Sequence, residues 1–273
     1  MSREPKVPPS QVGVAAPIVA NKHYAAASAF MPENLLREAR RQKGLAEKPV
    51  PQVCVLDPDG DMVRRLRAAG RAQQVPTWAC YHTDLHRLTE GGLELGVVGC
   101  AVGAPFAVLV AEQLFASGCR LLVSITSAER LAELRPPPYF VLIERALRDE
   151  GTSYHYQPPT EFSHAEPKLL EAMEGAFAHI RVPVERRATW TTDAPVRETQ
   201  ESVDAMTANC ARVSTSSLVN SEATWVLTVL GETKSASAIA LLVRPCATSA
   251  STSRSRGLSR PSCPIRVCAA GKE

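Results

Sequence analysis

Apolar residues over most of the chain fall into two alternating patterns, short continuous runs and helical stripes. Continuous runs predict buried strands at residues 53–56, 93–99, 121–125, 139–143 and 184–191. Amphipathic or apolar stretches, several bounded by proline and glycine, predict helices at 32–43, 61–69, 107–117, 168–179 and 198–208. A shorter run predicts one more strand at Trp78–His82. Such alternation is typical of a sheet that helices cover on both faces, so the pattern predicts an α/β domain.

The pattern weakens toward the C-terminus. Residues 223–230 predict a strand, and residues 236–243 predict a strand or a helix. Ser, Thr, Arg, Pro and Cys then dominate without any apolar period, which indicates a disordered tail at 244–273. At the other end, the prolines of residues 1–30 indicate an irregular N-terminal arm. The folded domain is therefore expected at residues 31–243.

Composition excludes several classes of protein. The chain is 45% hydrophobic and 22% charged, which is ordinary for a soluble globular protein, and its net charge of +3 is too small to indicate a nucleic-acid partner. No run approaches the ~18 apolar residues of a membrane span, and the N-terminus lacks the apolar stretch of a secretory signal. We therefore expect a cytoplasmic protein with neither nucleic acid nor membrane as a partner.

The chain has eight cysteines, none of them in a C-x-x-C pair. Cys54, Cys100 and Cys119 lie in apolar runs, where a free cysteine behaves as a small core residue. We therefore expect reduced, buried thiols, with a disulfide framework or a metal site as the alternatives. No cluster of His, Cys and Asp has the spacing of metal ligands, so no metal site is predicted.

The strand at 93–99, the turn Gly99–Pro105 and the helix after it form the clearest structural signal in the sequence. Glycine lets a backbone approach a ligand closely, and the N-terminus of a helix offers unpaired N–H groups and a positive dipole end. The turn therefore suits a phosphate or a sugar oxygen, although a tight strand-to-helix turn without a ligand explains its glycines equally well. It matches neither the G-x-G-x-x-G pattern nor a Walker loop.

The segment Gly96–Ser127 resembles the nucleoside phosphorylase family, which includes uridine phosphorylase and hexameric purine nucleoside phosphorylase. The family has a strand there, then a glycine-rich turn, a helix containing E-E-L and a strand ending in G-T-[AT]-G. Three further segments resemble family motifs in the same order: Val55–Val63 (VLDPDGDMV), Asp149–His155 (DEGTSYH) and Thr189–Glu198 (TWTTDAPVRE). The resemblance covers about residues 20–208.

This resemblance implies a three-layer α/β domain with a mixed, largely parallel central sheet. It also implies a pentosyltransferase, that is, a glycosyltransferase of nucleoside catabolism and nucleotide salvage. Such an enzyme splits a purine or pyrimidine nucleoside with phosphate into the free base and a pentose 1-phosphate. Inorganic phosphate is then a co-substrate, no other cofactor is expected, and the chain is expected to form a homo-oligomer because family members share residues across an interface.

The resemblance also implies roles for particular residues. The phosphate contacts would come from Ser127, Arg64 and Gly60, and the ribose or base contacts from His23, Gly103, Thr192, Asp193 and Arg197. His23 would reach the ribose of a neighbouring subunit. No catalytic acid, base or nucleophile is implied. The plainer alternatives are a solvated helix face for Arg64, a surface position for His23, and a turn organised by Asp193 before Ala-Pro.

Two positions depart from the family's phosphate site. Ser124 stands where the family often has an arginine, and Glu129 replaces the second glycine of the family's turn. A carboxylate at that turn repels phosphate unless a cation offsets it. The alternative to phosphorolysis is therefore a nucleosidase, in which water replaces phosphate.

The family's V-E-M-E-x-A-A motif, whose glutamate holds the ribose hydroxyls, has no counterpart in this chain. Residues 209–217 read NCARVSTSS instead, and Glu222 is the nearest carboxylate in a similar setting. Without this motif, a non-catalytic nucleoside-binding homologue is a further alternative. The residues that would choose between a purine and a pyrimidine lie mainly in the same region, so the sequence does not indicate which base is bound.

Two origins explain the lost motif: a shifted reading frame from about residue 210, or a divergent C-terminal part. Translating the other two frames downstream of codon 208 separates them. A segment resembling E-M-E in either frame supports the shift, and its absence from both excludes it.

Overall fold

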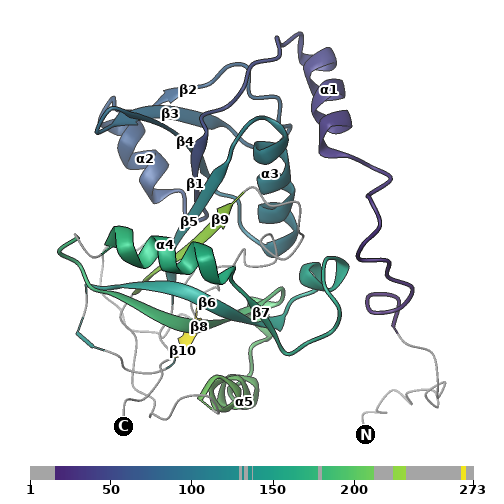
Figure 1. Cartoon of the computed structure of the whole chain (residues 1–273), viewed down its shortest axis with the longest axis vertical. Coiled ribbons are helices and arrows are strands. Elements are labelled where there is room, and N and C mark those ends of the chain that lie inside the picture. Colours follow the sequence, from purple (N-terminus) through teal and green to yellow (C-terminus); the bar gives the residue numbers. More distant parts are fainter. Residues whose placement is uncertain are drawn as a thin grey trace, which may run out of the picture.

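The computed structural model describes residues 16–128, 131, 135–136, 138–177, 180–211, 224–231 and 266–268, the last two ranges as backbone only. Figure 1 shows a central sheet with helices packed around it and the N-terminal arm running along one side. Residues 16–30 of this arm contain turns but neither helix nor strand.

Most of the predicted elements are present with small differences at their ends, whereas the strands at 73–74, 85–90, 162–164 and 266–268 were not predicted. The helices are α1 (Pro32–Lys43), α2 (Asp61–Ala68), α3 (Ala104–Ala116), α4 (Pro167–Phe177) and α5 (Gln200–Ala211), with the short 3-10 helices η1 (Thr152–His155) and η2 (Pro195–Arg197). The strands are β1 (Val53–Asp57), β2 (Gln73–Gln74), β3 (Leu85–Glu90), β4 (Leu93–Gly99), β5 (Leu121–Ala128), β6 (Phe140–Asp149), β7 (Phe162–His164), β8 (Val184–Thr192), β9 (Thr224–Gly231) and β10 (Arg266–Cys268).

These strands form one sheet in the order β10-β8-β6-β9-β5-β1-β4-β3-β2, with β7 paired to β6. Two groups of strands are parallel, β4-β1-β5 and β9-β6-β8. The antiparallel pair β5-β9 joins the two groups, and antiparallel pairs also form both edges of the sheet. The predicted mixed sheet is therefore confirmed, with its parallel pairs in the interior.

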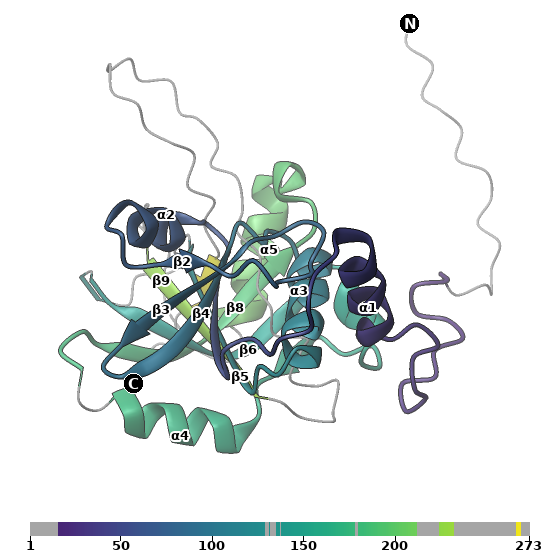
Figure 2. The ribbon, with the colours of Figure 1, turned by 90° about the horizontal axis from the view of Figure 1, so that it is seen from above.

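The two faces of the sheet are covered by different helices, because successive side chains of a strand point to opposite sides. Cys54 and Leu56 of β1 belong to the buried cluster that includes the apolar side of α3. Val55, between them, packs with α2, and Leu142 of β6 packs with α4. Figure 2 shows α3, with α1 outside it, on the opposite side of the strands from α2. This arrangement is the predicted three-layer α/β architecture.

Strand β9 occupies a central place, between β5 and β6. Its presence confirms the strand predicted at 223–230. Of the tail predicted at 244–273, only β10 is described, and it pairs with β8. Residues 236–243 lie outside the described part of the chain.

The strand predicted at Trp78–His82 is wrong, because this segment forms a loop and the strand lies further along, at β3. Trp78 donates a hydrogen bond from Nε1 to Oγ1 of Thr83, 3.0 Å away, across the loop. Lys43 of α1 donates to the carbonyl oxygen of Cys80 at 2.5 Å. Trp78, Ala79 and Cys80 are therefore buried without strand pairing, whereas Tyr81 is exposed.

The cysteines agree only in part with the expected reduced, buried thiols. Cys54, Cys80 and Cys119 are free and buried, whereas Cys100 is free but exposed. Cys210, at the end of α5, is disulfide-bonded. The prediction was wrong for Cys100 because its apolar run ends in the turn before α3, and wrong for Cys210 because spacing along the chain does not reveal spatial pairing.

Two glycine substitutions test the packing of the sheet. A Cβ at Gly96 of β4 would lie 2.7 Å from Sγ of Cys54 and 3.1 Å from Cδ1 of Leu85, whereas a Cβ at Gly175 of α4 meets no atom within 4 Å. We expect Gly96→Ala to lower the free energy of unfolding by roughly 1–3 kcal/mol. Gly175→Ala should raise it by about 0.5–1 kcal/mol, because alanine is the better helix former. Urea denaturation measures both, and equal effects would contradict this packing.

Candidate functional site

The loop Asp57–Gly60, called here the 57–60 loop, leaves β1 at its carboxyl end. The carboxylate of Asp57 accepts a hydrogen bond from the backbone N–H of Val63 at 2.9 Å, which holds the first turn of α2. Its carbonyl oxygen accepts from the N–H of Cys100 at 3.0 Å, which ties the loop to the turn before α3. Gly60 has φ +71° and no room for a side chain, since a Cβ would lie 2.5 Å from Sγ of Cys100. The loop and the turn therefore form one compact unit.

Asp59 joins this loop to the end of β5. Its carboxylate accepts hydrogen bonds from the N–H of Ser127 at 2.8 Å and from Oγ1 of Thr126 at 3.1 Å. Burial raises the pKa of Asp59, and the hydrogen bonds from Ser127 and Thr126 partly oppose that rise. A carboxylate of the protein thus accepts a hydrogen bond from Ser127, one of the three residues that the sequence assigned to phosphate.

The three residues predicted to contact phosphate do lie together, around Asp59. Arg64 donates a hydrogen bond to the carbonyl oxygen of Asp59 at 3.1 Å and pairs with the carboxylate of Asp61. Nη1 of Arg64 also lies close to Gly60, 2.8 Å from where a Cβ would stand if this residue had a side chain. Ser127 closes the group through its bond to Asp59. Glu129, whose charge would bear on this group, lies outside the described residues.

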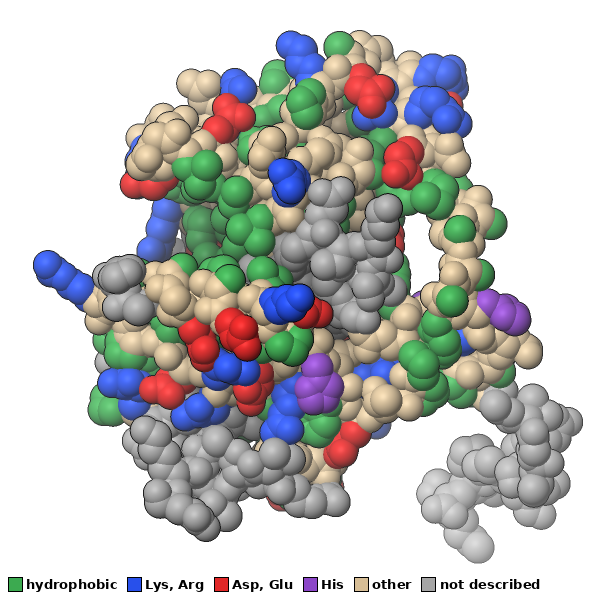
Figure 3. Space-filling view, in the orientation of Figure 1, with side chains coloured by type: hydrophobic (Ala, Val, Ile, Leu, Met, Phe, Trp, Pro, Cys, Tyr) green, Lys and Arg blue, Asp and Glu red, His purple; other side chains and the backbone are tan. Residues whose placement is uncertain are grey.

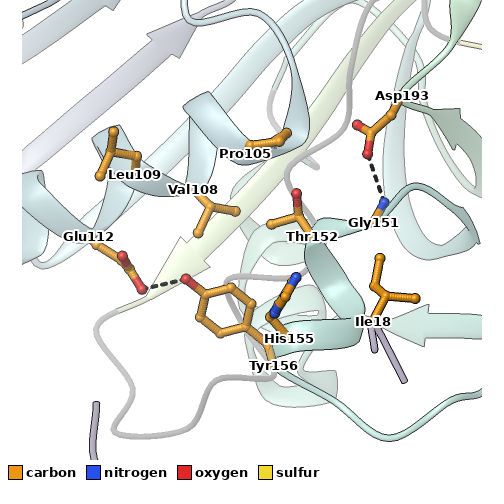
Figure 4. A pocket seen from close by; sticks show the side chains of 10 residues that line it. All are labelled: Ile18, Pro105, Val108, Leu109, Glu112, Gly151, Thr152, His155, Tyr156 and Asp193. Carbon is orange, nitrogen blue, oxygen red and sulfur yellow. Dashed lines mark hydrogen bonds between the residues drawn. The ribbon is translucent and has the colours of Figure 1, made fainter. Parts of the chain in front are cut away.

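A pocket of about 430 Å³ lies beside α3 and is called here the α3 pocket. Its wall combines the arm, α3, η1 with its neighbours, and the residue after β8: Ile18, Pro105, Val108, Leu109, Glu112, Gly151, Thr152, His155, Tyr156 and Asp193 (Figure 4). The α3 residues recur at helical spacing, so a single stripe of this helix faces the pocket. Cavities of this size and mostly apolar lining are typical of small-molecule sites.

Three hydrogen bonds order the polar side of the α3 pocket. The hydroxyl of Tyr156 donates to Oε1 of Glu112 at 2.7 Å. Burial is the main cause that raises the pKa of Tyr156, and the hydrogen bond to Glu112 raises it further. The N–H of Gly151 donates to Oδ2 of Asp193 at 2.7 Å. Nζ of Lys22, in the arm, lies 2.9 Å from Nδ1 of His155. Segments far apart in the sequence are thereby held around one cavity.

A buried arginine supports the part of the wall that contains η1. Arg148 donates to Oγ of Ser153 at 2.8 Å, to the carbonyl oxygen of Pro158 at 2.6 Å and to Oγ1 of Thr160 at 2.8 Å. Its guanidinium also lies 4.3 Å from the ring centroid of Tyr154. One guanidinium group thus binds both Ser153, within η1, and residues 158–160, which follow it. The position of η1 therefore depends on Arg148.

The residues predicted to contact ribose or base are only partly brought together. Asp193 lines the α3 pocket, and Gly103 precedes α3 two residues before Pro105. Thr192 accepts a hydrogen bond on Oγ1 from the N–H of Ala194 at 3.2 Å and so stabilises the turn after β8. His23 and Arg197 are exposed and do not line this pocket.

Sequence reasoning missed Asp59, Glu112 and Tyr156. Glu112 carried a usable signal, because it is the single charged residue of α3 (APFAVLVAEQLFA). Asp59 lies two residues after the end of a buried strand, at the carboxyl edge of the sheet where parallel α/β proteins bind ligands. Tyr156 directly follows the DEGTSYH segment, but no sequence pattern could show that it would meet Glu112.

Neither the charges on the face in Figure 3 nor the described His, Cys, Asp and Glu residues indicate a nucleic-acid or metal site. Basic and acidic side chains are interspersed on the face in Figure 3, without a patch of one sign. Within the described ranges, no group of three or more His, Cys, Asp or Glu residues could hold a metal ion. No helix in this part of the chain has the length and apolar character needed to cross a membrane.

The chain matches the family model described as the phosphorylase superfamily over residues 52–243. The matched range therefore extends beyond residue 208, where we expected the resemblance to fade. No curated protein is similar enough to count as a match.

Several solved structures are similar to this chain at low sequence identity. Uridine phosphorylase from Vibrio fischeri is 16% identical, with 67% of this chain and 81% of that chain covered and a TM-score of 0.48. Purine nucleoside phosphorylase from Toxoplasma gondii is 12% identical, with 71% and 72% covered and a TM-score of 0.46. A 5'-methylthioadenosine/S-adenosyl homocysteine nucleosidase from Helicobacter pylori is also 12% identical, with 66% and 84% covered and a TM-score of 0.46.

Replacing Arg148 tests whether it supports the wall of the pocket. Arg148→Met removes the donor to the buried hydroxyl of Ser153 and to acceptors on the exposed residues Pro158 and Thr160, so we expect the free energy of unfolding to fall by roughly 1–3 kcal/mol. Arg37→Met, on the exposed side of α1, should change it by about 0.5 kcal/mol or less. Chemical denaturation compares the two, and similar losses would show that the contacts of Arg148 do not stabilise the fold.

The raised pKa of Asp59 predicts a dependence of stability on pH. As pH rises above about 4, the unfolded chain loses this proton before the folded protein does. Between the two pKa values the folded state binds more protons, so stability falls as pH rises. Burial also raises the pKa of Asp57, which adds to the decline.

We expect a shallower decline for Asp59→Asn than for the unchanged protein, measured by urea denaturation at a series of pH values. Asp204→Asn, at an exposed position of α5, should leave the slope unchanged. An unaltered slope in Asp59→Asn would contradict a raised pKa of the carboxyl group at this position.

Proposed function

The chain belongs to the phosphorylase superfamily, and on that premise we propose that it is an enzyme that cleaves the N-glycosidic bond of a nucleoside with water. The observation that carries the choice of water is the contact between Asp59 and Ser127. A phosphate bound at Ser127 would have to displace this carboxylate, and the two anions would repel each other. Water has no charge and meets no such barrier.

Asp59 is the proposed general base of this reaction. Its carboxylate takes a proton from water while the water oxygen bonds to the anomeric carbon of the sugar. The bond from that carbon to the base nitrogen breaks, and the base leaves with the electron pair and is protonated by solvent. Burial raises the pKa of Asp59, which brings a carboxylate closer to the pKa range of effective bases.

The α3 pocket is the proposed binding site for the nucleoside. Its volume of about 430 Å³ accommodates a base and a sugar. Pro105, in the first turn of α3, lines it, and the N–H of Cys100, in the preceding turn, bonds to the 57–60 loop. The pocket and the 57–60 loop, which carries Asp59, thus both adjoin the turn before α3, and this neighbourhood supports a shared role.

Phosphorolysis remains the second candidate because Gly60, Arg64 and Ser127 lie together. In that reaction phosphate would replace the carboxylate of Asp59 at Ser127, and Arg64 would exchange its pairing with Asp61 for the phosphate. The product would be a pentose 1-phosphate. We retain a homo-oligomer and a cytoplasmic location as predictions for either reaction.

The release of free base from uridine, inosine and adenosine, with and without phosphate, tests the proposal. We expect release that does not depend on phosphate and yields free ribose. Release only with phosphate would overturn hydrolysis and support phosphorolysis. No release under either condition would support a nucleoside-binding protein without catalysis.

A substitution at Asp59 tests its role as the base. Asp59→Asn keeps the shape of the side chain but removes the proton acceptor, so we expect the rate of hydrolysis to fall by roughly 10²–10⁴-fold. Nucleoside binding should be little changed. Asp204→Asn serves as the matched control and should keep full activity. A rate in Asp59→Asn within about twofold of the control would exclude Asp59 as the general base.

A further inference from the structure

The α3 pocket presents carboxylates but no basic side chain of Lys or Arg among the described residues that line it. Glu112 stands toward one end of the pocket and Asp193 toward the other (Figure 4). Carboxylates accept hydrogen bonds and repel anions. A ligand that fits this wall must therefore offer hydrogen-bond donors, and it must lack a negative charge near Glu112.

The two carboxylates differ in their surroundings. Asp193 is exposed, and it accepts a hydrogen bond from the backbone N–H of Gly151. Glu112 is half-buried on the same stripe of α3 as Val108 and Leu109, and its Oε1 accepts from the hydroxyl of Tyr156. A carboxylate among apolar side chains has little water to satisfy its remaining lone pairs. Glu112 is therefore the carboxylate that gains most from a donor on the ligand.

The apolar stripe indicates which part of a nucleoside lies near Glu112. Pro105, Val108 and Leu109 offer a surface that suits a flat nucleobase better than a sugar rich in hydroxyl groups. The opposite side, with Gly151, Thr152 and Asp193, is polar and suits the sugar. A base placed against α3 then turns its edge toward Glu112.

We propose that Glu112, oriented by Tyr156, is a specificity-determining residue that binds the exocyclic amino group of a nucleobase. This inference rests on the proposed function, because it takes the α3 pocket as the nucleoside site. The amino group donates to the carboxylate of Glu112, and the Tyr156 hydroxyl keeps that carboxylate in place. Bases without an amino group leave the carboxylate without this donor and bind more weakly.

Equilibrium binding of matched nucleosides tests the inference separately from catalysis. Guanosine and inosine differ only in one amino group, and so do adenosine and purine riboside. We expect the member with the amino group to bind roughly tenfold or more tightly, as expected for one hydrogen bond to a charged group. Isothermal titration of the full chain measures all four dissociation constants.

Substitutions then assign the preference to a residue. Glu112→Gln keeps an acceptor for the Tyr156 hydroxyl but removes the charge, so the preference within each pair should fall to about twofold or less. Tyr156→Phe keeps the charge but removes the orienting hydroxyl, and its preference should lie between those of Glu112→Gln and the unchanged protein. Glu171→Gln, at an exposed position of α4, is the matched control and should keep the full preference.

The possible outcomes separate this inference from the proposed function. Binding of all four nucleosides without preference, or a preference that survives Glu112→Gln, overturns the role of Glu112 alone. A preference that depends on Glu112 without any release of base supports the inference and overturns the proposed hydrolysis. Absence of binding by all four purine nucleosides overturns the inference, and the proposed hydrolysis is overturned as well if uridine releases no base.

Discussion

The hydrogen bonds of the Asp59 carboxylate are the interaction on which the interpretation of this structure depends. They connect the loop after β1 to Ser127 near the end of β5, two neighbouring strands of the sheet. The connection draws Gly60, Arg64 and Ser127 into one group and also places an anion among them. The same contact that brings the expected phosphate residues together therefore also places a carboxylate beside Ser127, and this carboxylate is the basis of the proposed hydrolysis.

The α3 pocket depends on a different constraint, because segments that are far apart in the sequence must be held side by side to form it. The N-terminal arm, α3, η1 and the turn after β8 meet there through Ile18, Glu112, Tyr156 and Asp193. Arg148 holds the segment around η1 with hydrogen bonds from a single buried side chain. A rigid support of this kind allows a carboxylate such as Glu112 to be aimed at one part of a ligand.

The C-terminal part of the chain illustrates how sequence and structure contribute different information. The lost E-M-E motif indicated either a shifted frame or divergence, and the residues alone did not decide between them. The structure adds that β9 lies in the middle of the sheet, and the family match reaches residue 243. Translation of the other two reading frames decides between the two origins. The strand at 223–230 was predictable because a continuous apolar run identifies a buried strand, but its two neighbours in the sheet were not.

The sequence by itself determined the order of most helices and strands, the α/β class and the resemblance to nucleoside phosphorylases. These depend on local periodicity and on motifs that keep their order along the chain. Tertiary structure decided that Trp78–His82 is a loop, that Asp59 takes the hydrogen bonds of Ser127, and that Tyr156 meets Glu112. The physical reason is that these features depend on how segments distant in sequence pack together. That packing is set by the whole sheet and not by neighbours in the sequence.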